Sequence, residues 1–241
     1  MGPFIFHFYL SMNKYLVPPL FLLFAVFVWG CDKASGPQPE QTQRLFVVLG
    51  SSTAAGTGAG TYDSSWVGRT NAYLRAAQLK NSMPPMHQSD TLINLAVPGF
   101  ASPDVLPAGN SAHNITKALS YHPYGIIINL PSNDIAEGIS EDTEMQNFAT
   151  VAALANQQNV EVWVTTSQPR NLSAAGRQKL IELRDKIIAT YGPRSIDFWT
   201  GLANPDGTIN PRYSAGDGIH LNHTGHRILF HRILEEGIFQ N

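Results

Sequence analysis

The stretch FVVLGSSTAAGTGAG at residues 46–60 changes character at its fifth residue. The run LFVVLG at 45–50 is short, apolar and rich in strand-forming residues, which is typical of a buried strand. From Gly50 onward the residues are small or polar and include further glycines, which indicates a turn. The sequence therefore predicts a strand that ends beside two serines, and either Ser51 or Ser52 is a candidate nucleophile.

Four more apolar runs have the same character, and helical patterns lie between them. The predicted strands are 45–50, 91–96, 125–130, 160–166 and 195–199, and the predicted helices are 65–80, 111–120, 143–157, 173–190 and 223–236. Because strands and helices alternate, we expect an α/β domain with a parallel sheet and helices on both of its faces. In such a sheet the functional site lies beyond the carboxyl ends of the strands.

Length and composition indicate one globular domain. The chain has 241 residues and a hydrophobic content of 43%, and the roughly 200 residues that follow the N-terminal segment suit one ordinary α/β domain. Sixteen Lys and Arg residues against eighteen Asp and Glu residues give a net charge of −2. The sequence contains no basic run or aromatic-interleaved basic patch, so we do not expect nucleic acid as a partner.

The N-terminal segment differs from the rest and contains the only cysteine of the chain. The uncharged run LFLLFAVFVWG at 20–30 suits the core of a signal peptide better than a membrane span, which needs about 20 apolar residues. It ends at Cys31 in VWGC, which resembles a bacterial lipoprotein signal, and lipidation explains a single cysteine in an exported protein. We expect a signal peptide over 1–30, a tether over 31–43 that begins at the lipidated Cys31, and one folded domain over 44–241, anchored in the cell envelope.

Other interpretations of this segment stay open. The apolar run also suits an uncleaved anchor, and Met12 is a second candidate start. Three Asn-x-Ser/Thr sequons would matter in a eukaryotic secretory pathway, which the lipoprotein-like signal argues against; they are Asn114, Asn171 and Asn222.

The loops after the predicted strands carry the parts of an acyl-transfer site. Ser52 follows the first strand, Gly99 the second and Asn133 the third, and the late segment GDGIHLN supplies Asp217 and His220. We predict Ser52 as nucleophile, His220 as general base and Asp217 as the residue that orients the imidazole. The backbone N–H groups of Ser52 and Gly99 and the side-chain amide of Asn133 are predicted to form the oxyanion hole. This chemistry requires no cofactor and no metal.

Four sequence blocks resemble those of the SGNH or GDSL hydrolases, over about residues 45–232. They occur in the family's order and are Gly50-Ser51-Ser52, NLAVPGFAS around Gly99, Pro131-Ser132-Asn133-Asp134, and Asp217-Gly218-Ile219-His220. The resemblance implies a flavodoxin-like three-layer α/β/α sandwich with a five-stranded parallel sheet, and esterase or lipase activity. It assigns to the five residues the roles already given.

Two positions depart from the family's pattern. Ser51 replaces an aspartate that helps to hold the nucleophile loop; its hydroxyl can still make a local hydrogen bond but carries no charge. Pro131 replaces a glycine, which removes a backbone N–H and fixes φ at about −65°. The first change questions the rigidity of the Ser52 loop, and the second questions the direction from which Asn133 approaches.

Several alternatives accompany this interpretation. His220, His223 and His226 suit zinc, but a loop and a helix do not present all three on one face, so we expect the last two to be ordinary polar residues of the final helix. The glycines of GTGAG at 56–60 lack the spacing of a nucleotide-binding loop. Asn133 alone would suit a helix cap, and Asp217 alone a turn.

The expected substrate is a small-molecule or polysaccharide ester with a short acyl or acetyl group, hydrolysed through an acyl-enzyme. Export favours an ester from the environment of the cell. The sequence also lacks a long apolar insertion that would form a lid over a fatty acyl chain. The alternatives are a lysophospholipase or lipase of the same family, and a catalytically weak surface lipoprotein that binds a glycan. The oligomeric state is not predicted.

Overall fold

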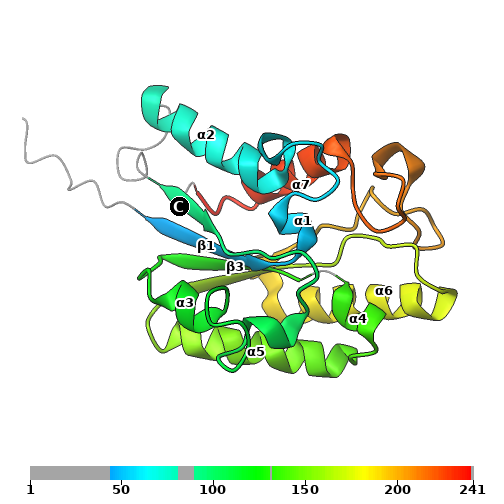
Figure 1. The fold of residues 1–241 in the computed structure, drawn as a ribbon, viewed down its shortest axis with the longest axis horizontal. Helices are drawn as coiled ribbons and strands as arrows, with labels where there is room; N and C mark the ends of the chain where they lie inside the picture. Colours follow the sequence, from blue (N-terminus) through cyan, green and yellow to red (C-terminus); the bar gives the residue numbers. More distant parts are fainter. Residues whose placement is uncertain (1–43, 81–89, 131, 240–241) are drawn as a thin grey trace, which may run out of the picture. The chain divides into compact units, whose positions relative to one another are not determined.

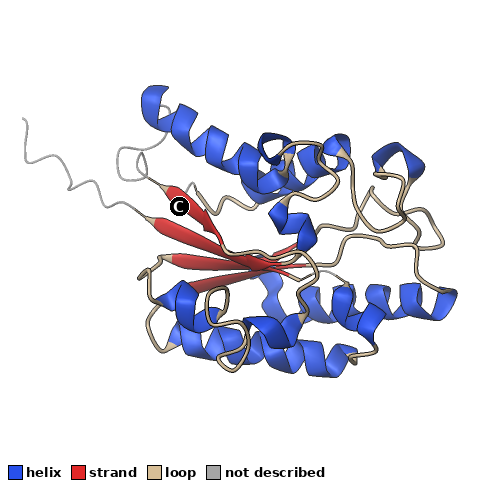
Figure 2. Ribbon diagram, in the orientation of Figure 1, coloured by secondary structure: helices blue, strands red, loops and turns tan. Residues whose placement is uncertain are grey.

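The computed structural model describes residues 44–80, 90–130 and 132–239. A sheet lies between two layers of helices (Figure 2). Its strands are β1 (Leu45–Gly50), β2 (Thr91–Asn94), β3 (Gly125–Asn129), β4 (Glu161–Thr165) and β5 (Ser195–Ile196). They run in the order β2-β1-β3-β4-β5, and every neighbouring pair is parallel. This is the flavodoxin-like order, and it confirms the predicted α/β sandwich.

Helices cover both faces of the sheet, as Figure 1 shows. On one face lie α2 (Trp66–Lys80) and α7 (His223–Glu235), and on the other lie α3 (Ile115–Leu119), α5 (Glu141–Asn156) and α6 (Ala174–Tyr191). Two short helices, α1 (Ser52–Ala55) and α4 (Asn133–Glu137), follow β1 and β3. Single 3₁₀ turns complete the described structure; they are η1 (Tyr62–Ser64), η3 (Ser102–Val105), η4 (Gly192–Arg194) and η5 (Pro211–Tyr213).

The first strand explains why two layers of helices are needed. Because successive side chains of a strand point to opposite faces, Phe46 and Val48 pack with Trp66 of α2 and with α7, while Val47 and Leu49 pack with α3 and α5. All four of these strand residues are completely buried. A strand that is apolar on both faces can be satisfied only in a sheet that is covered on both sides.

Side-chain hydrogen bonds cause the differences from the predicted boundaries. The helix predicted over 111–120 begins only at Ile115, because Asn114 caps it by accepting from the Lys117 N–H at 2.9 Å. The fifth strand stops at Ile196 because the Asp197 carboxylate accepts hydrogen bonds from the backbone N–H groups of Trp199 and Thr200, which turns the chain. The second strand is also shorter than predicted and ends at Asn94, and the short helices α1 and α4 were not predicted.

None of the helices in residues 44–80, 90–130 and 132–239 is long and apolar enough to span a membrane. The predicted signal peptide, the lipidation site at Cys31, the tether and the altered position Pro131 all lie outside the described residues.

Candidate active site

The predicted nucleophile lies where the strand order reverses, between β1 and β3. The N–H of Ser51 donates to the carbonyl of Asn129 at the end of β3, at 3.1 Å. The loops that follow β1 and β3 therefore begin side by side. Gly50 is required at this point, since a Cβ there would lie 2.7 Å from the Asn129 carbonyl oxygen. Ser52 follows as the first residue of α1 and is 9% exposed. The site therefore forms at the topological switch point, as the parallel sheet requires.

The structure brings Ser52, His220 and Asp217 together in a continuous hydrogen-bonded relay. His220 Nε2 lies 2.9 Å from Ser52 Oγ, and His220 Nδ1 lies 2.6 Å from Asp217 Oδ2. Because a carboxylate only accepts, Nδ1 carries the proton and Nε2 is left to accept from the Ser52 hydroxyl. A base in this tautomer is ready to remove the serine proton.

Asp217 is held by more than the imidazole. Its Oδ1 accepts from the backbone N–H groups of Ile219 at 2.9 Å and His220 at 2.8 Å, so the turn and the relay use the same carboxylate. Partial burial opposes its ionisation, but these backbone bonds and the bond to the His220 ring outweigh burial and lower the pKa of Asp217 to about 2. Asp217 is consequently an anion at any pH near neutrality.

A cavity of about 200 Å³ adjoins the relay. Its walls include the predicted oxyanion residues Ser52, Gly99 and Asn133; the others are Thr57, Pro98, Arg170, Ile219 and His220. Gly99 has a φ of +90°, and a Cβ built on it would meet nothing within 4 Å. The left-handed backbone at this position favours glycine, because side chains rarely adopt a positive φ.

The side-chain amide of Asn133 has a defined orientation. Its Nδ2 donates to the carbonyl of Phe100 at 2.8 Å, and its Oδ1 accepts from Arg170 at 3.0 Å. Asn133 is the first residue of α4, and the N-cap position belongs to Ser132, so Asn133 is not the helix cap. One hydrogen of Nδ2 remains after the bond to Phe100.

A buried polar network joins the loops that carry Gly99 and Asn133. Asp134 accepts from the Ser102 N–H at 2.9 Å and from the Ser102 hydroxyl at 2.5 Å, and Asn147 of α5 donates to the same hydroxyl at 2.7 Å. Burial raises the pKa of Asp134, while the two bonds from Ser102 lower it. Glu144 is fully buried beyond it, and burial raises its pKa well above the usual value, with the charges of Asp134 and Glu141 adding to the effect.

Ser51 does not replace the family's aspartate by a hydrogen bond of its own. Its side chain is 1% exposed, and its hydroxyl has no hydrogen-bond partner among the described residues. Backbone contacts hold the loop instead, because the Thr57 N–H donates to the Ser52 carbonyl at 2.9 Å and the Ala55 N–H to the Ser51 carbonyl at 2.9 Å. The local bond that a serine hydroxyl can make is thus not formed among the described residues, and backbone hydrogen bonds hold the loop.

The glycine-rich loop after α1 packs directly against the His220 loop. Gly58 has a φ of +88°, and a Cβ on it would lie 2.3 Å from the carbonyl oxygen of Leu221 and 2.9 Å from the Cβ of His220. No side chain fits between these two backbones. Gly58 thus allows the nucleophile loop and the base loop to touch, which is a structural role unrelated to phosphate binding.

His226 is not the ordinary polar residue that we predicted. It is completely buried; its Nε2–H donates to the Thr57 carbonyl at 3.0 Å, and its Nδ1 lies 3.4 Å from the Trp66 N–H. Burial lowers the pKa of His226 to about 4, against the opposing effect of the bond to Thr57, and the charges of His220 and Arg69 lower it further. His226 therefore supports the loop beside Ser52 as a neutral imidazole.

The three histidines of the zinc alternative do not converge. His220 faces Ser52, His226 faces Thr57, and His223 is exposed at the start of α7. Within the described residues, no group of three or more His, Cys, Asp and Glu side chains is arranged to hold a metal ion.

Sequence reasoning missed Arg170, which lines the cavity five residues after the end of β4. Burial lowers the pKa of its guanidinium, and the negative charges of Asp217 and Glu137 raise it. Its place beyond a strand end is the one signal that points to this arginine, whereas its contact with Asn133 leaves no signal in the sequence.

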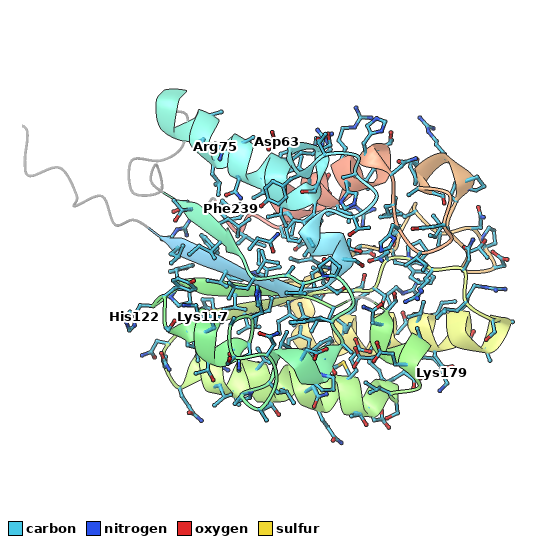
Figure 3. All side chains as sticks on the ribbon, in the orientation of Figure 1. Asp63, Arg75, Lys117, His122, Lys179 and Phe239 are labelled. Carbon is cyan, nitrogen blue, oxygen red and sulfur yellow. The ribbon has the colours of Figure 1, made fainter. Side chains whose placement is uncertain are left out.

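A larger hollow lies away from the relay. It measures about 470 Å³ and is lined by residues of α3 and by Leu154 of α5, with His122 beside them. Figure 3 shows Lys117 and His122 on the side where β1 and β3 begin, opposite to the ends of the strands that carry the relay. The smaller cavity is therefore the one that the predicted site residues share.

Known structures with the same fold are numerous. A GDSL-like lipase from Bacteroides thetaiotaomicron has a TM-score of 0.59 and 20% identity and covers 83% of this chain and 89% of its own. A lipase/acylhydrolase from Enterococcus faecalis has a TM-score of 0.61 and 18% identity, with 80% and 95% covered, and an acetyl xylan esterase has 0.60 and 16%, with 80% and 100% covered. At such identities the likeness concerns the fold alone.

The sequence comparisons identify a family for this chain but no close relative. No curated protein matches the chain. The family model described as the GDSL-like Lipase/Acylhydrolase family matches residues 48–228, which include every residue of the relay and of the cavity wall. By this match the chain belongs to the GDSL-like lipase/acylhydrolase family.

Proposed function

We propose that the protein is a serine esterase that hydrolyses carboxylic esters through an acyl-enzyme on Ser52. One observation carries the proposal: His220 Nε2 lies 2.9 Å from Ser52 Oγ while Asp217 holds the opposite ring nitrogen at 2.6 Å. A serine hydroxyl is a weak nucleophile unless a base stands within hydrogen-bond reach of it, and this arrangement supplies the base. Family membership supports a hydrolase that acts on esters.

In the first half of the reaction, Ser52 Oγ attacks the ester carbonyl carbon and its proton passes to His220 Nε2. Asp217 stabilises the resulting imidazolium, because its low pKa keeps it charged. The carbonyl oxygen becomes an anion that the N–H groups of Ser52 and Gly99 and the free Nδ2 hydrogen of Asn133 receive. Collapse of this intermediate breaks the ester C–O bond, and the imidazolium gives its proton to the departing alcohol.

In the second half, His220 removes a proton from a water molecule, which attacks the acyl carbon. The same donors hold the second oxyanion, and the bond from the acyl group to Ser52 Oγ breaks as His220 returns a proton to that oxygen. The carboxylic acid leaves and the resting relay is restored. Each proton that His220 accepts is returned, so the cycle consumes only the ester and water.

The cavity supports a short acyl group. A volume of about 200 Å³ is small beside the roughly 300–1,000 Å³ of sites that enclose drug-sized ligands, so an acetyl or similar group fits better than a fatty chain. The likeness to an acetyl xylan esterase agrees with an acylated polysaccharide as the substrate. We propose short acyl esters of small molecules or polysaccharides, and a lysophospholipase or lipase is the alternative.

A matched pair of serine variants tests this function. Purified protein is expected to hydrolyse p-nitrophenyl acetate; Ser52→Ala abolishes turnover, whereas Ser51→Ala retains it because that hydroxyl has no partner among the described residues. Equal loss in both variants contradicts the assignment of the nucleophile. No turnover on any of a panel of acyl esters favours the glycan-binding alternative, and a maximum at octanoate or longer in a chain-length series rejects the short acyl group.

We also propose that the chain is exported and anchored in the bacterial cell envelope by a lipid on Cys31. The support is in the sequence alone: an apolar run, the VWGC segment and one cysteine in the chain. Cells that express the full chain and are fed labelled palmitate should yield a labelled, membrane-bound protein. Cys31→Ser should lose the label and leave the membrane fraction. An unlabelled wild-type protein excludes lipidation.

A further inference from the structure

The guanidinium of Arg170 contacts the loop that carries Asn133 from the cavity side. Its Nη1 donates to Asn133 Oδ1 at 3.0 Å and makes longer contacts with the carbonyl oxygen of Ser132 at 3.4 Å and with the Ser132 hydroxyl at 3.3 Å. All three acceptors lie at or next to the N-terminus of the short helix α4. The shortest of these bonds goes to the amide that the proposed function places in the oxyanion hole.

The backbone that presents Arg170 is itself firmly held. The residues between β4 and this arginine are buried, and they are Thr166, Ser167, Gln168 and Pro169. The next residue, Asn171, donates its N–H to the carbonyl of Gly218 at 2.8 Å, which joins this segment to the loop of Asp217. A side chain that starts from such a segment can act as a fixed support, because the backbone does not have to be ordered first.

An arginine determines which way an asparagine amide points. Arginine has donors and no acceptor, so the atom of Asn133 that faces it must be the oxygen. The amide nitrogen then points the other way, where one of its hydrogens bonds to the carbonyl of Phe100 at 2.8 Å. With both of these partners in place, rotation of the amide by half a turn would set two donors against each other and two acceptors against each other. The second hydrogen of the nitrogen is left for the substrate.

The charge of Arg170 is only partly compensated. Among the described residues no carboxylate lies within 4.0 Å of its guanidinium, although Asp217 and Glu137 are near enough to raise its pKa. By contrast, Arg177 and Arg232 each pair with a carboxylate. A cation bonded to the amide oxygen draws electron density from the amide, which makes the opposite N–H a stronger donor where the solvent is partly excluded.

We propose that Arg170 is a positioning residue of this site: it fixes the amide of Asn133 with one N–H directed to the oxyanion and strengthens that donor. The inference rests on the proposed esterase function. It also explains how the third block works with a proline in place of the family's glycine, since the direction of Asn133 is set by its side-chain partners, Arg170 and Phe100. Arg170 itself does not touch the reacting atoms in this account.

A double-mutant cycle on p-nitrophenyl acetate tests the proposal. Arg170→Gln is expected to lower kcat by about 10- to 100-fold with KM changed by less than about threefold, because the lost interaction is made in the transition state. Asn133→Ala is expected to lower kcat by about 10²–10³-fold. If Arg170 acts through Asn133, adding Arg170→Gln to Asn133→Ala lowers kcat by less than about threefold more. Losses that multiply overturn the proposal.

Two further variants separate the outcomes. Arg170→Lys keeps a charge and a donor and should recover part of kcat, while Arg184→Gln, which breaks an ion pair with Asp185 within α6 and away from the cavity, should leave kcat unchanged. Active-site titration with a fluorophosphonate and thermal unfolding report the folded fraction. If Arg170→Gln lowers only that fraction, the residue is merely structural. If it raises KM for esters that carry a carboxylate and leaves neutral esters unaffected, it binds substrate instead.

A readout that needs no turnover keeps this inference separate from the proposed function. In protein labelled with ¹⁵N, the side-chain amide signals of Asn133 are identified by their loss in Asn133→Ala. Arg170→Gln should shift these signals and speed their hydrogen exchange, and the control Arg184→Gln should not. An inactive wild-type protein with this response would reject the esterase and keep the positioning role; unchanged Asn133 signals reject the positioning role whatever the activity.

Discussion

His220 and His226 lie six residues apart in one stretch of chain and have opposite environments. The ring of His220 stands between the carboxylate of Asp217 and the hydroxyl of Ser52, at 2.6 Å and 2.9 Å, and lines the cavity. The ring of His226 is completely buried between two backbone groups, and burial holds its pKa at about 4. One imidazole has a partner that stabilises a proton, and the other has surroundings that reject one.

The difference teaches that the partner decides what a histidine does. A carboxylate behind the ring favours the imidazolium that a general base must become. Backbone groups behind a buried ring fix its orientation and keep it neutral, which suits a support. The two are mechanically connected, because the loop that His226 holds at Thr57 also carries Gly58, against which the His220 loop packs. Five changes would break or sharpen this comparison, and they are taken from the largest expected effect to the smallest.

His220→Ala removes the base, and kcat on p-nitrophenyl acetate should fall by at least about 10⁴-fold. The ring is not part of the core, so we expect the melting temperature to stay close to that of the wild type. Initial rates normalised to protein give the first quantity and thermal unfolding the second. Activity within tenfold of the wild type would show that another group activates Ser52.

Asp217→Asn keeps the shape of the partner and removes its charge, so kcat should fall by about 10²–10⁴-fold. An amide can hold the ring but cannot stabilise the imidazolium. Because the pKa of the native carboxylate is about 2, the wild-type activity between pH 5 and 8 should not report its titration. If Asp217→Asn leaves kcat unchanged, a group other than Asp217 stabilises the imidazolium of His220.

His226→Leu should affect stability more than chemistry. It leaves the Thr57 carbonyl and the Trp66 N–H without their partner, which costs about 1–3 kcal/mol in the free energy of unfolding. A decrease of several degrees in melting temperature is expected, with kcat per titrated active site reduced less than about tenfold. His226→Gln, which can donate and accept, serves as the conservative control. A loss of kcat as large as that of His220→Ala would contradict the supporting role.

The same buried ring predicts a loss of stability in acid. Its pKa is about 4 in the folded protein and about 6.5 in the unfolded chain, so the unfolded state takes up the proton first as the pH falls. The contribution to the free energy of unfolding is therefore constant above about pH 6.5 and decreases toward pH 4, by on the order of 3 kcal/mol. Denaturant unfolding from pH 7 to 4 should show this slope in the wild type and lack it in His226→Gln. Parallel curves would mean that another group causes the slope.

His223→Ala should change almost nothing. This third histidine is exposed at the start of α7 and belongs to neither the relay nor the support. We expect kcat within about twofold and a free energy of unfolding within about 0.5 kcal/mol of the wild type. Dialysis against EDTA should also leave activity intact, because the three imidazoles face different partners. If EDTA abolishes activity and added zinc restores it, the zinc alternative is supported and this prediction is wrong.

The sequence predicted the sheet and its covering well because apolar runs and turn residues are local signals. All five strands lie where the runs indicated, and the rule of strand ends led to Ser52, Gly99 and Asn133. The observed boundaries differ from the predicted ones where a side chain accepts a hydrogen bond from a nearby backbone N–H, as Asn114 and Asp197 do. Such bonds depend on a conformation that composition alone does not reveal.

The support of the site was not predictable in the same way. Arg170 follows a proline in an unpatterned loop, and its contact with Asn133 spans 37 positions of the chain. His226 has the spacing of a helix-surface residue, yet it is completely buried and its ring contacts Thr57 of the glycine-rich loop and the Trp66 N–H at the start of α2. Residue types along the chain indicate which groups are available for chemistry, whereas the groups that hold them are recognised only once distant loops are brought together.

Gly58 has a consequence for anyone who intends to reshape this protein. It carries no functional group, but any other residue there would push the backbone at Leu221 away and take His220 with it, and a displacement of about 1 Å is enough to lose roughly 10²-fold in rate. In a saturation library screened for activity, position 58 should therefore tolerate as little variation as Ser52 does. A screen that equates intolerance with chemistry would misread it, and a designer would do better to vary Thr57, Pro98 and Ile219, which line the cavity.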